Sequence, residues 1–574
     1  MQLSDFLIES LKDKGVTHYF GYQGTMISYF VDAIARADGV ENHSCYNEQG
    51  AAFAACGLAQ STKNLAVAYA TSGPGAVNLL SGVANAYFDS LPVLFITGQV
   101  NTYEYLPGTQ VRQHSFQEAD IVGMAKPVSK YAVKIDNPDD IKYELEKACW
   151  IATHGRPGSV LLDIPMNIQR ADINPEKLRN YVPACVNNEG SIWDVIKDLE
   201  DNLKRSERPV FVMGNGVDRK SAKEILDCAH RYSIPVVTSL LGKDLVINDD
   251  EVCFGYVGGA YGVRSANLIT AKKADLLVCF GVSLVTRQTG TKVELFAPEA
   301  TVIRFDIDPH SFEREVGKIS KNYCIDVRDV SPILSKLELK RFDDWFEVCC
   351  KCREVLTSFD DSLPERIPNK LIASISQYIP NNAVIATDVG QHMMWVAQSM
   401  PVKEGQRFLF SGGHGAMGYA LPAAIGASYA PSFNSVFCVA GDGSFQMNLQ
   451  ELEWVAREQL PLKIVILNNH ALGMVRVQQK MYFNNEFEGT SVNYHYSVGS
   501  LSSIIRAYGI RAVDANLNTD FSAYKEQLSD DMPFALVIEL PEDSFAYPKT
   551  ILGNPIYNQS PFVPEDILNE LIAL

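Results

Sequence analysis

Asp442 and Asn469 are the residues of this 574-residue chain whose types and surroundings are best suited to chemistry. Asp442 lies between Gly441 and Gly443 in a tight turn that Ser444 completes. Glycines let backbone N–H groups approach a phosphate, and the N-terminus of a following helix favours its negative charge. A carboxylate and an amide oxygen, completed by a backbone carbonyl and phosphate oxygens, suit octahedral Mg²⁺. These residues therefore predict a site for a diphosphate and its metal ion.

The surrounding elements must bring these two residues together. An apolar run at 436–440, typical of a buried parallel strand, precedes the turn, and a second run at 464–467 precedes Asn469. A helical pattern over 447–458, stopped by Pro461, joins the two predicted strands. Both strands of such a unit end at the same edge of the sheet, so the two polar residues should lie side by side. Each piece alone is more often a simple loop, and it is the pair that favours a site.

Glu48 is a second candidate, in the first third of the chain. It precedes an alanine-rich helix expected at 51–59, and the next predicted strand, 65–70, ends in another glycine-rich turn at 71–78. A glutamate at the start of a helix is often only a favourable contact with the helix dipole. The adjoining strand–turn–helix unit instead favours a place for Glu48 in a binding site.

The motifs at 441–469 resemble the diphosphate- and metal-binding signature of thiamine-diphosphate-dependent enzymes. The wider string 447–475 resembles their acetohydroxyacid (acetolactate) synthase branch. This resemblance implies that Asp442, Asn469 and the carbonyl of Ala471 hold Mg²⁺. It also implies an activity, in which a 2-oxo acid such as pyruvate is decarboxylated and its acyl unit is transferred to a second carbonyl compound.

The resemblance also assigns roles in other turns of the two outer domains. Glu48 would bond to the pyrimidine nitrogen of the cofactor and promote its imino tautomer. The further catalytic candidates are Thr25, Phe116, Gln117, Met417 and Gln478. The further cofactor-binding candidates are Gly73, Asn78, Gln391, His392, Gly415, Met417, Gly441, Gly443, Ser444 and Met474. A core methionine would look the same as a cofactor-bending Met417, and a helix-cap role for His392 stays open.

A middle segment carries glycines at successive strand ends, which is typical of a nucleotide crevice. It resembles the FAD-binding middle domain of acetohydroxyacid synthases, where the flavin is mainly structural, although related enzymes have lost it. The candidates for FAD binding are Gly214, Gly216, Arg287, Asp306 and Asp326. Arg287 either pairs with a carboxylate inside this domain or holds the carboxylate of a 2-oxo acid.

The alternation of helical and strand-like patterns predicts an α/β fold with three doubly wound parallel-sheet domains. The expected parts are 1–175 (pyrimidine-binding), a linker near 172–190, 190–340 (central), 360–545 (diphosphate-binding) and a tail at 546–574. The tail could cover the active site or contact a partner subunit. Because Glu48 and Asp442 fall in different domains, and the family joins such domains across subunits, a homodimer or homotetramer is expected.

Composition narrows the class of protein. The chain has 47% apolar and 21% charged residues, and no apolar run long enough to span a bilayer. A net charge of −18 without a basic run argues against a nucleic-acid partner. The start, 1–15, resembles an amphipathic helix and not a signal peptide, so a cytoplasmic location is expected. The 12 cysteines are scattered, and those at 349–352 are expected on a helix and not in a metal site.

Two departures from the family bear on the second substrate. Gln478 replaces the tryptophan that selects the second oxo acid, and Thr25 replaces a glycine near the reactive carbon. These changes favour a polar or larger acceptor, such as a nucleotide-linked keto sugar, as in related enzymes of surface-polysaccharide pathways. Arg112 and His114 are either solvated loop residues or contacts for that acceptor. The alternatives are a cyclic-dione hydrolase, a 2-oxo acid decarboxylase or, in another class, an inactive regulatory homologue.

Overall fold

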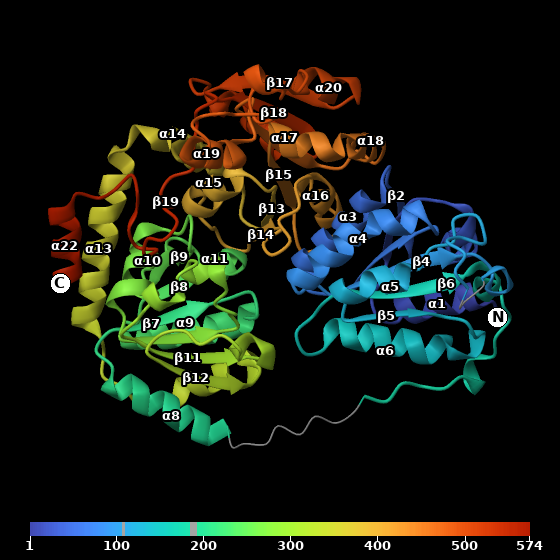
Figure 1. Cartoon of the computed structure of the whole chain (residues 1–574), viewed down its shortest axis with the longest axis horizontal. Coiled ribbons are helices and arrows are strands. Elements are labelled where there is room, and N and C mark those ends of the chain that lie inside the picture. The colour runs from blue at the N-terminus through green and yellow to red at the C-terminus, as the bar shows by residue number, and fades with distance from the viewer. Residues whose placement is uncertain (106–108, 184–191) are drawn as a thin grey trace.

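The computed structural model describes residues 1–105, 109–183 and 192–574, and it contains three six-stranded parallel sheets, each enclosed by helices (Figure 1). This confirms the predicted fold class. The predicted linker at 172–190 lies partly outside the described residues. Among the described residues, no helix has both the length and the apolar character needed to cross a bilayer.

The first sheet has the strand order β2-β1-β3-β4-β6-β5. Strands β3, β4 and β6 are buried along their whole length, which explains their continuous apolar sequences. The strands are β1 (His18–Gly21), β2 (Glu41–Ser44), β3 (Ala66–Ala70), β4 (Val93–Gln99), β5 (Tyr131–Lys134) and β6 (Val160–Pro165). The helices are α1 (Leu3–Lys12), α2 (Ser28–Arg36), α3 (Glu48–Thr62), α4 (Pro74–Phe88), α5 (Ile121–Ala125), α6 (Ile141–Thr153) and α7 (Met166–Gln169).

The second sheet has the order β12-β11-β10-β7-β8-β9. Its strands are β7 (Pro209–Met213), β8 (Val236–Thr238), β9 (Cys253–Tyr256), β10 (Leu276–Phe280), β11 (Thr301–Asp306) and β12 (Ile319–Cys324). Its helices are α8 (Ile192–Arg205), α9 (Arg219–Tyr232), α10 (Arg264–Leu268), α11 (Thr286–Thr289), α12 (Val327–Val330) and α13 (Asp343–Ser362). Cys349 and Cys352 lie on α13, buried in the core of this unit, as expected for helix cysteines.

The third sheet has the order β14-β13-β15-β16-β18-β17. Its strands are β13 (Ala383–Thr387), β14 (Arg407–Phe410), β15 (Ser435–Gly441), β16 (Leu462–Asn468), β17 (Arg511–Asn516) and β18 (Phe534–Glu539). Its helices are α14 (Ile367–Ser376), α15 (Gln391–Ser399), α16 (Ala420–Ala427), α17 (Asp442–Phe445), α18 (Leu452–Arg457), α19 (Gly473–Tyr482), α20 (Leu501–Ala507) and α21 (Lys525–Ser529).

The predicted continuous helix at 447–458 is wrong. The helical segment begins at Asp442 and is interrupted at Asn448, whose φ and ψ of −134° and 34° are not helical. The buried Asn448 side chain donates to the Gly418 carbonyl at 2.7 Å, so the residue at the break is held by a loop 30 positions earlier in the chain. The next helix, α18, then starts at Leu452.

The first and third units share one hydrophobic core, whose centre is the crossing of α3 and α16. Figure 1 shows these helices between the two sheets. A Cβ on Gly57 of α3 would lie 2.1 Å from the Ala423 carbonyl oxygen of α16, and one on Gly426 would lie 1.9 Å from that of Ala54. The small residues of α3 therefore permit a close approach of the two backbones.

The tail packs on the middle unit. It forms the short strands β19 (Lys549–Thr550) and β20 (Gln559–Ser560), followed by α22 (Glu565–Ala573), which lies beside α13 in Figure 1. The buried Arg264 donates to the carbonyls of Gln559 at 2.8 Å and Pro561 at 2.7 Å. The tail thus contacts the middle unit of its own chain.

Candidate active site

Asp442 and Asn469 lie at the same edge of the third sheet, as predicted. Gly441, the last residue of β15, pairs with Leu467 of β16, so the segments that follow these strands emerge together. Asp442 is buried, which raises its pKa to about 6, and the Tyr496 hydroxyl donates to its Oδ2 at 3.0 Å. The side chain is therefore held on one oxygen and kept from bulk water.

The glycines of this turn are required by close contacts. A Cβ on Gly443 would lie 2.5 Å from Leu472 Cδ2 and 2.6 Å from the Tyr496 hydroxyl, so no larger residue fits without displacement. The Gly441 N–H donates to Ser444 Oγ at 3.2 Å, which closes the turn. A bare backbone at the start of α17 is a suitable cradle for an anion.

Three buried side chains around this turn carry polar atoms without a partner in the described part of the chain: both amide atoms of Gln391, Nε2 of His392 and Nδ2 of Asn469. Burial lowers the pKa of His392 to about 3, so its ring is neutral at pH 7. A buried polar atom without a partner costs roughly 1–3 kcal/mol. A diphosphate and its cation would satisfy these atoms, so the residues present fit thiamine diphosphate and Mg²⁺.

The loop after β16 and the loop before α16 complete this region. Ala471 is buried and forms an isolated antiparallel bridge with Ser491, which fixes its backbone. Gly415 has a φ of +70°, a conformation that glycine adopts without strain, and the adjacent Met417 is half-buried.

Glu48 lies against the second predicted glycine-rich turn. Asn78 Nδ2 donates to its Oε2 at 2.9 Å, and a Cβ on Gly75 would lie 2.9 Å from its Oε1. The helix α3 starts at Glu48, with the Asn47 side chain accepting from the Gln49 N–H as an N-cap. The structure thus brings together Glu48 and Asn78, which are 30 positions apart.

The other candidates of the first unit have different surroundings. Met26, next to Thr25, donates its N–H to Thr71 Oγ1 at 3.2 Å, which places that turn beside the second glycine-rich turn. Gln117 has a φ of +63°, and its Cβ would lie 3.0 Å from a Cβ on Gly73. Phe116, in contrast, is 79% exposed.

Arg112 and His114 are both exposed. The His114 backbone N–H donates to Glu118 Oε2 at 2.9 Å. Within a single chain, the surroundings of Arg112 and His114 are therefore those of loop residues in solvent, which was one of the two alternatives.

A cavity of about 1130 Å³ is lined by residues of all three units and of the tail. The predicted candidates that line it are Gly216, Arg287, Asp306, Asp326, Met474 and Gln478. Gly214 is not among its lining residues; a Cβ there would lie 2.1 Å from the Gly281 carbonyl oxygen, so this glycine permits backbone packing instead. The tail segment 549–554 forms another wall, which places the tail at this cavity.

Arg287 bonds across two units. Its guanidinium donates to the Gly412 carbonyl, and the Gly412 and Gly413 N–H groups donate to Asp89 at 3.1 and 2.6 Å. Burial raises the pKa of Asp89 to about 7. Arg287 thus bonds to a backbone carbonyl of the third unit, whereas one of the two predicted alternatives was a carboxylate of the middle domain.

Sequence reasoning missed Asp89, Glu451 and Tyr496. Glu451 accepts the Tyr46 and Asn47 N–H groups at 3.1–3.2 Å, and it therefore holds the backbone just before Glu48. No local pattern marks Tyr496 or Asp89. Glu451 falls in the family-like string 447–475, and that was the one available signal.

Comparison with known proteins agrees with this geometry. Residues 1–124 match the family described as "Thiamine pyrophosphate enzyme, N-terminal TPP binding domain", 196–337 match its central domain and 388–538 match its C-terminal TPP binding domain. The matched segments contain Glu48, the glycines of the second sheet and the Asp442 turn, respectively.

Relatives match over nearly the whole length. The acetolactate synthase isozyme 2 large subunit of Escherichia coli (strain K12) is 34% identical over 555 residues, 96% of this chain and 97% of that protein. The acetolactate synthase large subunit of Lactococcus lactis (strain IL1403) is 32% identical, covering 96% and 94%. The probable acetolactate synthase large subunit of Methanocaldococcus jannaschii is 34% identical, covering 94% and 92%. With its three matched domains and its parallel-sheet units, the chain belongs to the acetolactate synthase-like family of thiamine pyrophosphate enzymes.

Proposed function

We propose that this protein is a thiamine-diphosphate- and Mg²⁺-dependent carboligase. It decarboxylates a 2-oxo acid, with pyruvate as the first candidate, and transfers the acyl unit to a second carbonyl compound. The observation that carries this proposal is the set of buried, unpartnered polar atoms on Gln391, His392 and Asn469 beside the Asp442 turn.

The chain's own residues divide this work. When bound, thiamine diphosphate supplies the electron sink for the loss of CO₂ from a 2-oxo acid. Asp442, Asn469 and the Ala471 carbonyl would hold the cation, and Gln391 and His392 would donate to the diphosphate. The buried position of these groups strengthens their electrostatic contacts.

Glu48 would hold a proton at the pyrimidine nitrogen of the cofactor. Its hydrogen bond from Asn78 orients the carboxyl group, and Gly75 leaves room against it. Gly73 and Gln117 would line this part of the site, next to the turn that carries Thr25.

Two chains would complete the site. Within the described residues, the lining of the cavity of about 1130 Å³ includes neither Glu48 nor Asp442. In the family that the chain resembles, these two domains meet across a subunit interface, so Glu48 of one chain would face Asp442 of a second chain. This arrangement requires a homodimer, and a pair of dimers gives a homotetramer.

The acceptor would be a polar keto compound such as a nucleotide-linked keto sugar. Gln478 and Arg287 line one cavity, which offers amide and guanidinium donors for such a compound. Its volume of about 1130 Å³ is slightly larger than the roughly 300–1,000 Å³ usual for small-molecule sites.

The other end of this cavity would hold FAD. Asp306 at the end of β11 and Asp326, the N-cap of α12, would bond ribose hydroxyls, and Gly216 lines the same cavity. The absorption spectrum of purified protein should show flavin bands. A spectrum without them after incubation with FAD and gel filtration would refute flavin binding.

The activity is tested by product analysis. We expect purified protein with thiamine diphosphate, Mg²⁺, pyruvate and a keto-sugar nucleotide to release CO₂ and to form a new carbon–carbon bond, measured by NMR. Rapid acetolactate formation from pyruvate alone would refute the keto-sugar acceptor. Acetaldehyde without ligation would indicate a decarboxylase, and cleavage of a cyclic dione would indicate a hydrolase.

Replacing Glu48 tests the site itself. Glu48→Gln should lower the rate of CO₂ release about 10²–10⁴-fold, the usual contribution of general acid–base catalysis, while thiamine diphosphate still binds. Glu9→Gln, an exposed change on α1, is the matched control. A Glu48→Gln protein as active as wild type would favour a role other than the proposed catalysis.

A further inference from the structure

Two histidines and a glutamate, none of them among the candidate active-site residues, gather at the edge of the first sheet. His18 lies on β1, and Glu41 and His43 lie on β2, the edge strand. The register pairs His18 with Glu41, and residues two apart on a strand share a face. The strand geometry therefore places all three side chains on one face, the face that meets the third unit.

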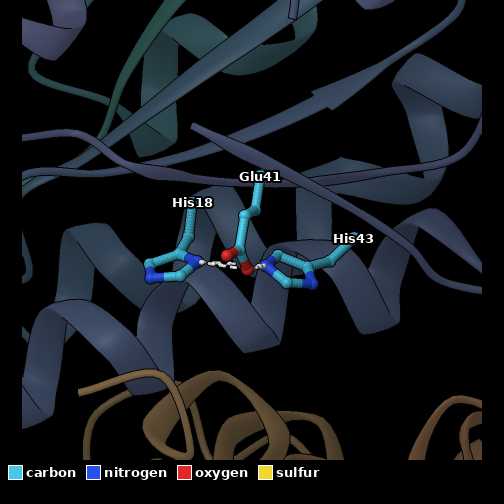
Figure 2. A group of neighbouring side chains, drawn as sticks. All are labelled: His18, Glu41 and His43. Carbon is cyan, nitrogen blue, oxygen red and sulfur yellow. Dashed lines mark hydrogen bonds and ion pairs between the residues drawn. The ribbon is translucent and has the colours of Figure 1, made fainter. Parts of the chain in front are cut away.

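The three side chains converge on a single point. His18 Nδ1 lies 3.0 Å from His43 Nε2, and Glu41 Oε2 lies 3.7 Å from each of these nitrogens. Figure 2 shows the Glu41 carboxylate between the two rings, with one ring nitrogen of each directed toward it. Ligand atoms about 2.0–2.2 Å from a tetrahedral Zn²⁺ are themselves roughly 3.3–3.6 Å apart. The nitrogen–nitrogen separation of 3.0 Å is shorter than this range, and the two nitrogen–oxygen separations of 3.7 Å are longer.

A second layer of contacts orients His43. Its Nδ1 lies 3.1 Å from Glu458 Oε2, and that carboxylate also accepts from the Tyr429 hydroxyl and, through Oε1, from Arg457 at 3.1 Å. A proton on Nδ1 shared with Glu458 leaves Nε2 with a free lone pair, directed at the point of convergence. Metal-bound histidines usually have such a carboxylate behind them.

We propose that His18 Nδ1, His43 Nε2 and the Glu41 carboxylate form a binding site for a Zn²⁺ ion. The borderline-soft nitrogen and oxygen donors are those that Zn²⁺ accepts. Glu41 is 67% exposed along its side chain while His43 is 4% exposed, so the fourth position faces solvent and takes a water molecule. Through His43 and Glu458 the ion would fasten the edge strand of the first unit to the third unit.

A hydrogen bond between the two imidazoles, with no ion, is the simpler account of the same 3.0 Å contact. It predicts no response to Zn²⁺ and little effect of replacing Glu41. The two accounts therefore differ in a direct binding measurement.

The test uses the untagged full chain, saturated with thiamine diphosphate and Mg²⁺ so that the predicted Asp442 site is filled. Zn²⁺ is titrated by calorimetry against a competing chelator, and Co²⁺ is titrated as a spectroscopic probe. We expect one Zn²⁺ per chain, the visible bands of four-coordinate Co²⁺, and a rise in the melting temperature with Zn²⁺.

Variants decide where the ion binds. Glu41→Gln, at an exposed position that leaves folding intact, and His43→Gln should each weaken Zn²⁺ at least about tenfold and remove the thermal shift. Glu458→Gln, behind His43, should weaken Zn²⁺ about 10–100-fold.

His230→Gln is the matched control, because this imidazole lies 3.0 Å from Asp250 and 3.4 Å from Glu251 but outside the cluster. It should bind Zn²⁺ as wild type does. The proposal is overturned if wild-type protein binds no Zn²⁺, or if Glu41→Gln and His43→Gln bind it as tightly as wild type.

Discussion

At the scale of single residues, buried carboxyl groups set the geometry of the candidate site. Glu451 holds the backbone N–H groups of Tyr46 and Asn47, directly before Glu48, and burial raises its pKa to about 7. Glu451 follows the Asp442 turn, just beyond the break at Asn448, so the stretch that carries the diphosphate motif also contacts the backbone before Glu48 of its own chain. The pyrimidine and diphosphate parts of one chain are therefore mechanically connected.

Tyr496 is expected to position Asp442. Tyr496→Phe removes the hydroxyl that lies 3.0 Å from Asp442 Oδ2 and keeps the ring. Since groups behind a metal ligand contribute about 10–100-fold to affinity, Mg²⁺ should activate this variant only at correspondingly higher concentration. Tyr494→Phe, two residues away, should behave as wild type. Equal Mg²⁺ dependence of both variants would exclude this role.

Asp163 should make stability depend on pH. It is buried on β6 and accepts from Thr97 at 2.7 Å and Gln99 at 3.1 Å, and burial raises its pKa from 3.8 to about 7. Because the folded-state pKa is the higher one, its stabilising contribution is fully present below pH 3.8 and is lost as the pH rises to about 7.

Denaturant unfolding between pH 5 and 8 measures this effect. In wild type, Asp163 should make the free energy of unfolding fall by up to about 1.4 kcal/mol for each unit of rising pH. Asp163→Asn should lack this contribution. Asp136→Asn, at an exposed position in the same unit, is the control. Parallel pH profiles of wild type and Asp163→Asn would contradict the expectation.

At the scale of elements, the α3–α16 crossing joins the first and third units. Gly57→Ala would place a Cβ 2.1 Å from the Ala423 carbonyl oxygen, a backbone atom that cannot move aside alone. We expect a loss of about 1–3 kcal/mol in the free energy of unfolding, the usual cost of overpacking a core. Gly499→Ala, whose Cβ would meet only the Ile504 side chain at 3.4 Å, should change stability little. Chemical denaturation compares the two variants.

The positions of some elements could be predicted from the sequence, but their exact ends and interruptions could not. β15 and β16 extend the apolar runs predicted at 436–440 and 464–467 by one or two residues at each end. The helix expected at 447–458 is divided, because the buried Asn448 bonds to Gly418 from a different loop. The helical periodicity of the local sequence gives no sign that Asn448 will bond to Gly418.

At the scale of the whole molecule, the proposed assembly can be tested by complementation. Glu48→Gln and Asp442→Asn should each be inactive alone. If one site takes Glu48 from one chain and Asp442 from the other, a mixed dimer keeps one intact site, and random co-expression should restore about a quarter of the wild-type activity. Activity that stays at the level of the single variants would place both groups of one site in the same chain.

The sequence by itself determined the three parallel sheets and the placement of Asp442 beside Asn469. Apolar runs ending in glycine-rich turns specify buried parallel strands, and parallel strands bring their ends to one edge. Only the tertiary structure decided that Glu451 holds the start of α3 from about 400 positions away, that Gln478 and Arg287 share one cavity, and that Glu458 stands behind His43. Such contacts depend on how the units pack against one another, and local patterns carry no record of that packing.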